Sequence, residues 1–199
     1  MHISEGRIQS KLERRLQRKR KDLLAIFRCR YFAPFDARRT LLPNDSVDLV
    51  YSHTVLEHIP PAIIDGIPRE SYRILKPDGI TCHVIDNSDH WIQRDGTISY
   101  VNFLRYEDWV WKLISINPID SQNRLRNYEY IALLEKWGFH IILDRPVLEQ
   151  RALPAFNTLK LCRRYASVPK EQLALCRLNI IARAAKEKQS VLPRMRETA

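Results

Sequence analysis

A histidine and two aspartates lie together in the segment VIDNSDHW, directly after an apolar run. An aspartate that orients a histidine ring allows that histidine to act as a base, which removes a proton from a hydroxyl or an amine during group transfer. We therefore take His90 as a candidate catalytic base, with Asp86 or Asp89 as the residue that orients it. The alternative is that the aspartates only shape a turn or cap a short helix.

Two further histidines follow another apolar run, VDLVYS, at residues 47–52. His53 and His58 are five residues apart, and His58 comes directly after Glu57. Either ring could line a binding site, or could instead hydrogen-bond to the backbone and pack at the start of a helix. Asp48, inside the run, is expected to make a structural hydrogen bond.

Side chains that could hold the anionic group of a substrate occur later in the chain. Arg105 lies in the aromatic segment FLRYEDWVWKL (103–113), which is either a lid over a substrate or a helix packed on the core. Asn123 and Arg124 lie in the segment NRLRNYEY, whose two arginines could hold a phosphate or a carboxylate. Surface salt bridges are the alternative for these arginines.

The four cysteines indicate neither a metal site nor a disulfide framework. They are Cys29, Cys82, Cys162 and Cys176, and no two of them form a Cys-x-x-Cys pair. Because metal sites and disulfide-rich domains use short, repeated spacings, we expect free and mostly buried thiols, and no metal ion.

An α/β fold with a largely parallel sheet would position these side chains. The apolar patterns predict strands at 26–32, 47–52, 80–86, 141–149 and 177–184, and helices at 5–25, 59–75, 128–139 and 169–176. Such an order of strands and helices is typical of α/β proteins. Ligands of these sheets bind beyond the carboxyl ends of the strands, which points to residues 36–37, 52–54 and 86–90.

Three segments resemble the class I S-adenosylmethionine-dependent methyltransferases, in the order in which that family has them. They are FDARRTLLPNDSVDLVYS (35–52), SHTVLEHI (52–59) and ESYRILKPDGITCHVID (70–86). The resemblance runs from about residue 26 to 150, and more loosely to 184. It implies a Rossmann-like sheet flanked by helices, with the methyl donor S-adenosylmethionine bound along the strand ends.

The resemblance also implies which residues bind the donor. Asp36 would accept a hydrogen bond from the adenine amino group, and the backbone N–H of Ala37 would face the adenine ring. The methionine and sulfonium end of the donor would be lined by Ser52, His53 and Thr54, with His58 close below it.

The sequence departs from this family on one side of the donor site. The family has a glycine-rich loop after its first strand and an acid after its second strand. The glycines of this chain are Gly6, Gly66, Gly79, Gly96 and Gly138, and none lies in such a loop. We therefore expect an N-terminally incomplete sheet, an exposed apolar edge at residues 47–52, and weak or absent donor binding.

The net charge of +10 is concentrated at the two ends of the chain. Residues 1–39 hold 12 basic and 4 acidic side chains, residues 40–150 hold 10 and 16, and residues 151–199 hold 11 and 3. The basic ends could meet an anionic partner or could be solvated helix faces. Because the basic helix lacks interleaved aromatic residues and a nucleic-acid-binding signature, we do not expect nucleic acid as a partner.

Three parts are predicted along the chain. Residues 1–25 form a basic amphipathic helix, residues 26–185 a methyltransferase-like α/β domain, and residues 186–199 a frayed tail. No apolar run is long enough to cross a membrane, and the N-terminus lacks the apolar centre of a secretory signal, so we expect a cytoplasmic protein.

The sequence thus predicts a methyltransferase fragment that transfers a methyl group from S-adenosylmethionine to a small molecule or a glycan. The glycan preference comes from the family resemblance of the HVIDNSDHW and NRLR segments. Two alternatives remain. The first is a non-catalytic methyltransferase-like protein that pairs with a partner or with itself through the exposed sheet edge. The second is a basic nucleic-acid-binding domain.

Overall fold

The computed structural model describes residues 19, 22, 25–116 and 122–186. It divides the chain after Asp36 into two units, which we describe separately. The basic helix and the tail predicted at the two ends of the chain fall almost wholly outside the described residues.

The strand predicted at residues 26–32 is wrong. This part of the first unit has a helical turn at Ala25–Ile26 and then continues without regular structure. Its apolar side chains are open to solvent, since Ile26 is 73% and Phe27 is 70% exposed. An alternation of apolar residues forms a strand only where neighbouring strands can pair with it, and no described segment does so here.

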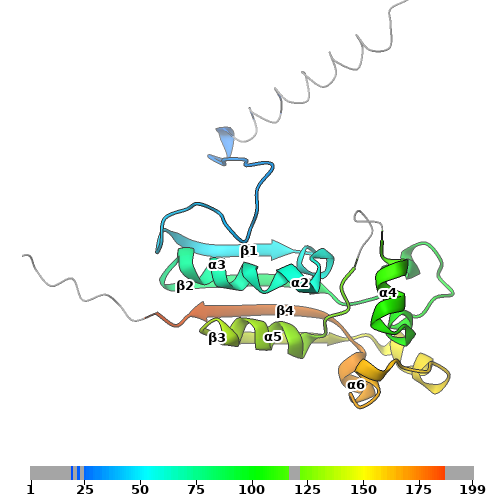
Figure 1. Ribbon diagram of the computed structural model, residues 1–199. Coiled ribbons are helices and arrows are strands. Elements are labelled where there is room, and N and C mark those ends of the chain that lie inside the picture. The colour runs from blue at the N-terminus through cyan, green and yellow to red at the C-terminus, as the bar shows by residue number, and fades with distance from the viewer. Residues whose placement is uncertain (1–18, 20–21, 23–24, 117–121, 187–199) are drawn as a thin grey trace, which may run out of the picture. The chain divides into compact units, whose positions relative to one another are not determined.

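The second unit is built on a four-stranded sheet in the order β1-β2-β4-β3 (Figure 1). The strands are β1 (Val47–His53), β2 (Leu75–Asp86), β3 (Phe139–Leu148) and β4 (Leu175–Ala184). The pair β1–β2 is parallel, whereas β2–β4 and β3–β4 are antiparallel. The predicted α/β class is confirmed, but the described sheet is mixed and not largely parallel, because the final strand runs opposite to its two neighbours.

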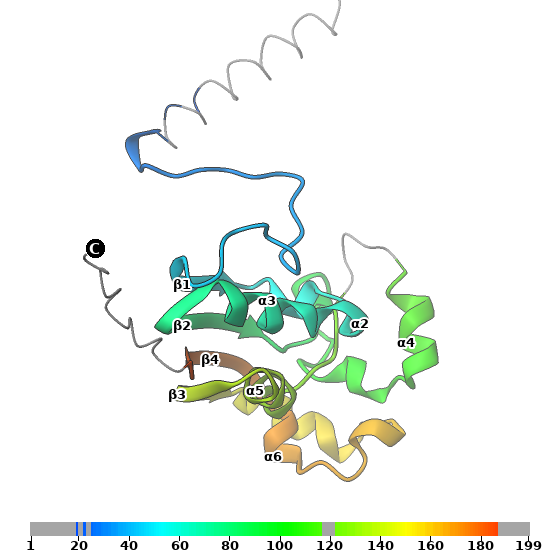
Figure 2. The same cartoon turned by 60° about the vertical axis from the view of Figure 1, so that its left-hand side comes forward.

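Three helices cover one face of this sheet, as Figures 1 and 2 both show. They are α2 (Pro61–Ile64), α3 (Gly66–Ile74) and α5 (Asn127–Lys136). Two more helices, α4 (Asp108–Ile114) and α6 (Lys170–Leu173), lie beyond the carboxyl ends of β1 and β2. Short 3₁₀ helices complete the unit: η1 (Leu56–His58), η2 (His90–Gln93), η3 (Asn102–Arg105), η4 (Gln150–Asn157) and η5 (Arg163–Tyr165).

Two apolar clusters form the core. The first lies between the sheet and its helices, where Leu75 and Ile85 of β2 meet Leu134 of α5. The second surrounds α4 and α6 and includes the buried ring of Trp111. Trp109 is 68% exposed, so the aromatic segment 103–113 buries only part of its rings.

The strand β1 forms one edge of the described sheet, since β2 is its neighbour on one side and no described strand lies on the other. Leu49 is 51% and Tyr51 is 59% exposed on this strand. An apolar edge was expected from the sequence, and the structure confirms it. The four cysteines are free, with Cys162 and Cys176 buried. No helix in the described ranges is long and apolar enough to span a membrane.

Candidate functional site

Polar side chains line a cavity at the carboxyl ends of β1 and β2. The two strands run parallel, so the residues that follow them emerge at the same edge of the sheet. The cavity has a volume of about 390 Å³, and its lining includes Thr54 and His58 after β1, and Asp86 and His90 at the end of β2. Four of the residues predicted to form a site are therefore brought together.

The closest pair in this cavity is His90 with Asp86. The Nε2 atom of His90 lies 3.7 Å from Oδ2 of Asp86, which makes an ion pair when the ring is protonated. Asp86 is held in place by Ser88, whose backbone N–H and hydroxyl donate to Oδ1 at 3.0 and 2.6 Å. This is the arrangement in which a carboxylate orients a histidine.

The pKa values of the pair follow from these contacts. Burial raises the pKa of Asp86, but the contact with His90 and the hydrogen bonds from Ser88 outweigh burial and lower it to about 2. The contact with Asp86 raises the pKa of His90, although burial opposes this. His90 can therefore act as a base only at a pH above its raised pKa.

Asp89 does not line the cavity. It is fully buried, and its side chain accepts a hydrogen bond from the N–H of Trp91 at the start of η2. This is the helix-capping alternative considered from the sequence. Of the two aspartates, only Asp86 forms an ion pair with His90 among the described residues.

Glu57 belongs to this site, although sequence reasoning assigned it no role. Its side chain is 1% exposed, Oε1 accepts a hydrogen bond from the N–H of Asp86 at 3.3 Å, and burial raises its pKa. Its Oε2 atom has no hydrogen-bond partner among the described residues. The only sequence signal was an acid directly before His58.

Glu57, His58 and His90 offer ligand atoms that all lie within 4.8 Å of one another, which is close enough to share a metal ion. The spacing along the sequence did not indicate this set, because it comes from two distant segments. The pKa values of Glu57 and His90 are both raised, and a protonated group does not bind a metal. Protons therefore compete with a metal ion for these groups, and the absence of a metal stays a prediction.

Of the predicted run Ser52-His53-Thr54, only Thr54 lines the cavity. The hydroxyl of Ser52 is within 2.7 Å of Nδ1 of His83, a buried histidine of β2. His53 is exposed, and its Nδ1 lies 3.3 Å from the hydroxyl of Thr54. Ser52 and His53 thus lie outside the cavity lining, and their contact with the donor stays a prediction.

Asp36 and Ala37 are separated by the division of the chain into units. Asp36 is the last residue of the first unit, and Ala37 is the first residue of the second. Ala37 is exposed and does not line the cavity at the carboxyl edge. The contact of Asp36 with adenine stays a prediction.

The three residues predicted to bind the acceptor have structural surroundings. Asn123 is buried and donates to the carbonyl oxygens of Leu56 and Ile59 at 2.7 and 2.8 Å. Arg124 is 3% exposed and donates to the carbonyl oxygen of Phe103 at 2.9 Å, and also to Asp108.

Arg105 is exposed beside the ring of Tyr106, at 5.8 Å from the ring centroid. Asn123 and Arg124 are hydrogen-bonded inside the fold, and Arg105 lies outside the cavity lining, so the binding of an acceptor by these residues stays a prediction.

Comparison with known proteins finds one family model that matches part of the chain. Residues 7–83 match the family model described as "Methyltransferase domain". This stretch includes Thr54 and His58 of the cavity lining. This match agrees with the resemblance to the class I S-adenosylmethionine-dependent methyltransferases that the sequence shows.

Similar solved structures include a Haloferax volcanii complex that contains the Trm112 methyltransferase activator, with 21% identity over 76% of this chain and 60% of that chain, and a TM-score of 0.43. A SAM-dependent methyltransferase from Methanosarcina mazei is 17% identical over 76% of this chain and 66% of that chain, with a TM-score of 0.44. The chain spans 60% and 66% of the length of these two. No curated protein matches the sequence.

Proposed function

We propose that this chain contributes to an S-adenosylmethionine-dependent methyltransferase that acts on a small molecule or a glycan. One observation carries the proposal: Thr54, His58, Asp86 and His90 converge in one cavity at the carboxyl edge of the sheet, and the first two lie inside the methyltransferase-domain match. Ligands of α/β sheets bind at this edge.

The residues of the cavity fit such a reaction. When bound, S-adenosylmethionine supplies a methyl group on a sulfonium, which is already activated for transfer. Nε2 of His90 faces Asp86, so in the neutral ring the other nitrogen, Nδ1, would accept the proton of an acceptor hydroxyl or amine. Asp86 then stabilises the imidazolium that results. Thr54 and His58 would lie toward the methionine end of the donor.

Titration of the ¹⁵N-labelled chain with S-adenosylmethionine tests this proposal by NMR. We expect weak, saturable shifts of the amide signals of Thr54 and His58, and His58→Ala should weaken binding further. The matched control is His140→Ala, since His140 is exposed on β3, away from the cavity lining. Shifts that spare both Thr54 and His58, or an equal effect of the control, would contradict the proposal.

The exposed edge of β1 supports the alternative that the chain associates with a partner or with a second copy of itself through this strand. Leu49 and Tyr51 present apolar surface there. A strand edge of this kind favours association with another strand. The two functions are compatible, because the edge strand and the cavity use different side chains.

A further inference from the structure

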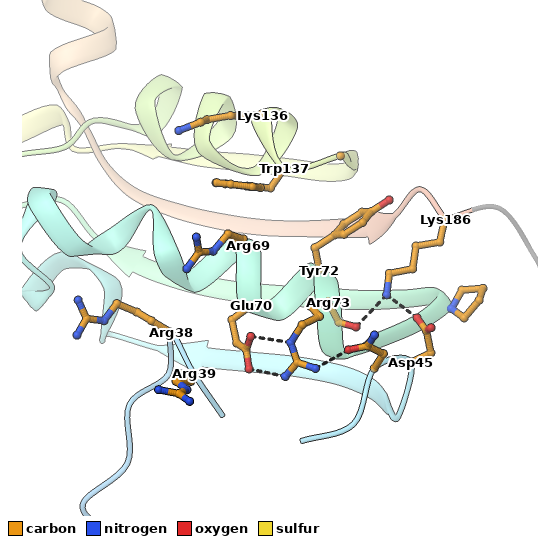
Figure 3. Close-up of a pocket in the computed structure, with 13 residues that line it drawn as sticks. Arg38, Arg39, Asp45, Arg69, Glu70, Tyr72, Arg73, Lys136, Trp137 and Lys186 are labelled. Carbon is orange, nitrogen blue, oxygen red and sulfur yellow. Dashed lines mark hydrogen bonds and ion pairs between the residues drawn. The ribbon is translucent and has the colours of Figure 1, made fainter. Parts of the chain in front are cut away.

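A second cavity lies at the amino ends of β1 and β2, whereas the histidine cavity lies at their carboxyl ends. Figure 3 shows the residues that line it. Its volume is about 1310 Å³. Asp45, which precedes β1, and Arg73, which precedes β2, are part of its lining, so the cavity sits at the amino ends of these parallel strands. Trp137 at the end of α5 and Lys186 after β4 also line it.

The lining of this cavity is strongly basic. Its cations are Arg38, Arg39, Arg69, Arg73, Lys136 and Lys186. Its acids are Asp45 and Glu70. Six cations against two carboxylates leave an excess of four positive charges, although the segment 40–150, which supplies most of the lining, is acidic overall. The excess is therefore a local property of the cavity.

Lys186, Arg73 and Lys136 each have a carboxylate partner among the described residues. Lys186 pairs with Asp45 at 2.6 Å, and Arg73 pairs with Glu70 at 2.7 Å. Lys136 pairs with Asp65 at 2.7 Å, and both of these side chains are partly exposed. Exposed pairs of this kind are weak, so an anion of higher charge can compete for Lys136.

Arg39 and Arg69 are the cations that a ligand would find available. Both are exposed, and neither makes a hydrogen bond or an ion pair with a residue that the structure describes. The guanidinium of Arg69 lies over the ring of Trp137, 5.9 Å from its centroid. Contact with an aromatic face limits the orientations of a guanidinium while its N–H groups stay free to donate.

The backbone beside Arg39 is fixed before any ligand binds. Glu70 accepts hydrogen bonds from the backbone N–H and the hydroxyl of Thr40 at 2.7 and 2.6 Å. The same carboxylate is held by Arg73, as Figure 3 shows. This network ties the backbone of the segment that carries Arg39 to α3, so the backbone need not be ordered when a ligand binds, which lowers the entropic cost of binding.

We propose that this cavity binds a small organic or inorganic anion that carries two or more phosphate groups, through Arg39, Arg69 and Lys136. Guanidinium groups match phosphate oxygens with paired, charge-assisted hydrogen bonds. The three cations come from three separate parts of the chain around a large cavity, which suits several charged groups better than one. The site lies away from the proposed methyl-transfer site and does not depend on it.

The ring of Trp137 favours a small anion over single-stranded nucleic acid. Proteins that bind single strands offer open aromatic faces on which bases stack. Figure 3 shows Lys136 and Arg69 on the two sides of this ring, and both lie over it, at 5.3 and 5.9 Å from the ring centroid. A base that stacked on Trp137 would have to displace these two cations.

Calorimetric titration of the full chain with tripolyphosphate at low salt tests the proposal. We expect saturable binding of one tripolyphosphate, and a loss of affinity of about tenfold or more in the double variant Arg39→Ala/Arg69→Ala. Arg145→Ala is the matched control, because Arg145 is an exposed arginine of β3 outside the cavity lining. Its affinity for tripolyphosphate should equal that of the unchanged chain.

The source of the phosphate groups is distinguished with ATP in place of tripolyphosphate. Equal affinities assign binding to the phosphate chain alone, and tighter binding of ATP adds a contact with the nucleoside; both results support the site. Three results would overturn it. They are the absence of saturable binding, an equal loss in Arg145→Ala, and tighter binding of a single-stranded RNA through the same two arginines.

Discussion

His83 is a buried histidine of β2 with a hydroxyl group at each ring nitrogen. Its Nδ1 lies 2.7 Å from the hydroxyl of Ser52, and its Nε2 lies 2.6 Å from the hydroxyl of Thr81. Burial lowers the pKa of His83 from 6.5 to about 4. The ring is therefore neutral in the folded chain at neutral pH. It contacts side chains of the sheet and does not line the cavity that contains His90.

This pKa makes the stability of the fold depend on pH. Between about 6.5 and 4, the unfolded chain binds a proton at His83 that the folded chain excludes, so the free energy of unfolding falls as the pH drops. The raised pKa of His90 has the opposite effect, but its contribution is fully present below 6.5. Glu70 and Asp86, whose pKa values are lowered to about 2, matter only below their ordinary values of 4.5 and 3.8.

We predict that the stability of His83→Gln falls less between pH 6.5 and pH 5 than that of the unchanged chain. The raised pKa values of Glu57 and Asp89 oppose the effect of His83 as the pH drops, but they act in both proteins and cancel in the comparison. Urea unfolding at the two pH values measures this loss as a difference, whatever the variant costs at neutral pH. His140→Gln, at an exposed histidine, should keep the loss of the unchanged chain. An equal loss of stability in His83→Gln and in the unchanged chain would contradict this explanation.

Residues of the cavity could be predicted from the sequence where their position next to the end of a strand was sufficient evidence. Asp86 ends the parallel strand β2, and His58 and His90 come shortly after β1 and β2. Because the carboxyl ends of parallel strands meet at one edge of the sheet, these residues are expected to lie together. Asn123 and Arg124 could not be judged in this way, because the carbonyl groups that hold them belong to residues far away in the sequence. A polar side chain that supports the fold and one that faces a ligand look alike in a single sequence.

At the scale of elements, the turn between α5 and β3 depends on one glycine. Gly138 has a φ of +85°, a conformation that side chains with a Cβ rarely adopt. A Cβ at this position would also lie 3.0 Å from Cε2 of Tyr72. The Tyr72 ring is held by a hydrogen bond from its hydroxyl to the carbonyl of Ala185 at 2.9 Å, so it has little freedom to withdraw.

We expect Gly138→Ala to destabilise the fold by at least about 1–2 kcal/mol, the cost of a left-handed conformation for a residue with a Cβ. Gly96→Ala is the matched control, because nothing lies within 4 Å of a Cβ at that position. Its effect should stay within about 0.5 kcal/mol. Thermal unfolding of the two variants gives the comparison, and equal melting temperatures would contradict this account of the turn.

Most elements could be predicted from local patterns, and the exceptions have a physical cause. The strand at 80–86 and the helix at 128–139 have a periodicity that fits one structure only, and β2 and α5 lie there. The segment 26–32 has an equally good alternation but forms no strand, since strand formation also needs a neighbouring strand. The direction of β4 likewise depends on pairing, which a local pattern does not report.

At the scale of the whole molecule, the edge strand β1 determines how the chain meets other chains. Its apolar side chains Leu49 and Tyr51 are exposed next to backbone groups that no described strand pairs. Proteins commonly protect such edges with charged side chains, especially lysine. The strand β1 has no lysine or arginine, and its one acidic side chain, Asp48, pairs with Lys76.

We predict that the purified chain self-associates in a concentration-dependent manner and that Leu49→Lys shifts it toward the monomer. Size-exclusion chromatography with light scattering measures both effects. Leu113→Lys is the control, because Leu113 is 63% exposed but lies on α4, away from the edge. A chain that is monomeric at every concentration, or two variants with the same effect, would show that the edge does not mediate association.

The central position of β4 also has a consequence for synthesis on the ribosome. Of the four strands, β4 is made last, yet it lies between β2 and β3 in the sheet. While the chain emerges, β1 and β2 can pair, but β3 has no neighbour until residue 184 has left the ribosome. The ion pair between Lys186 and Asp45, 141 positions apart, forms later still. The nascent chain must therefore keep the apolar face of β3 from aggregating until its final strand arrives.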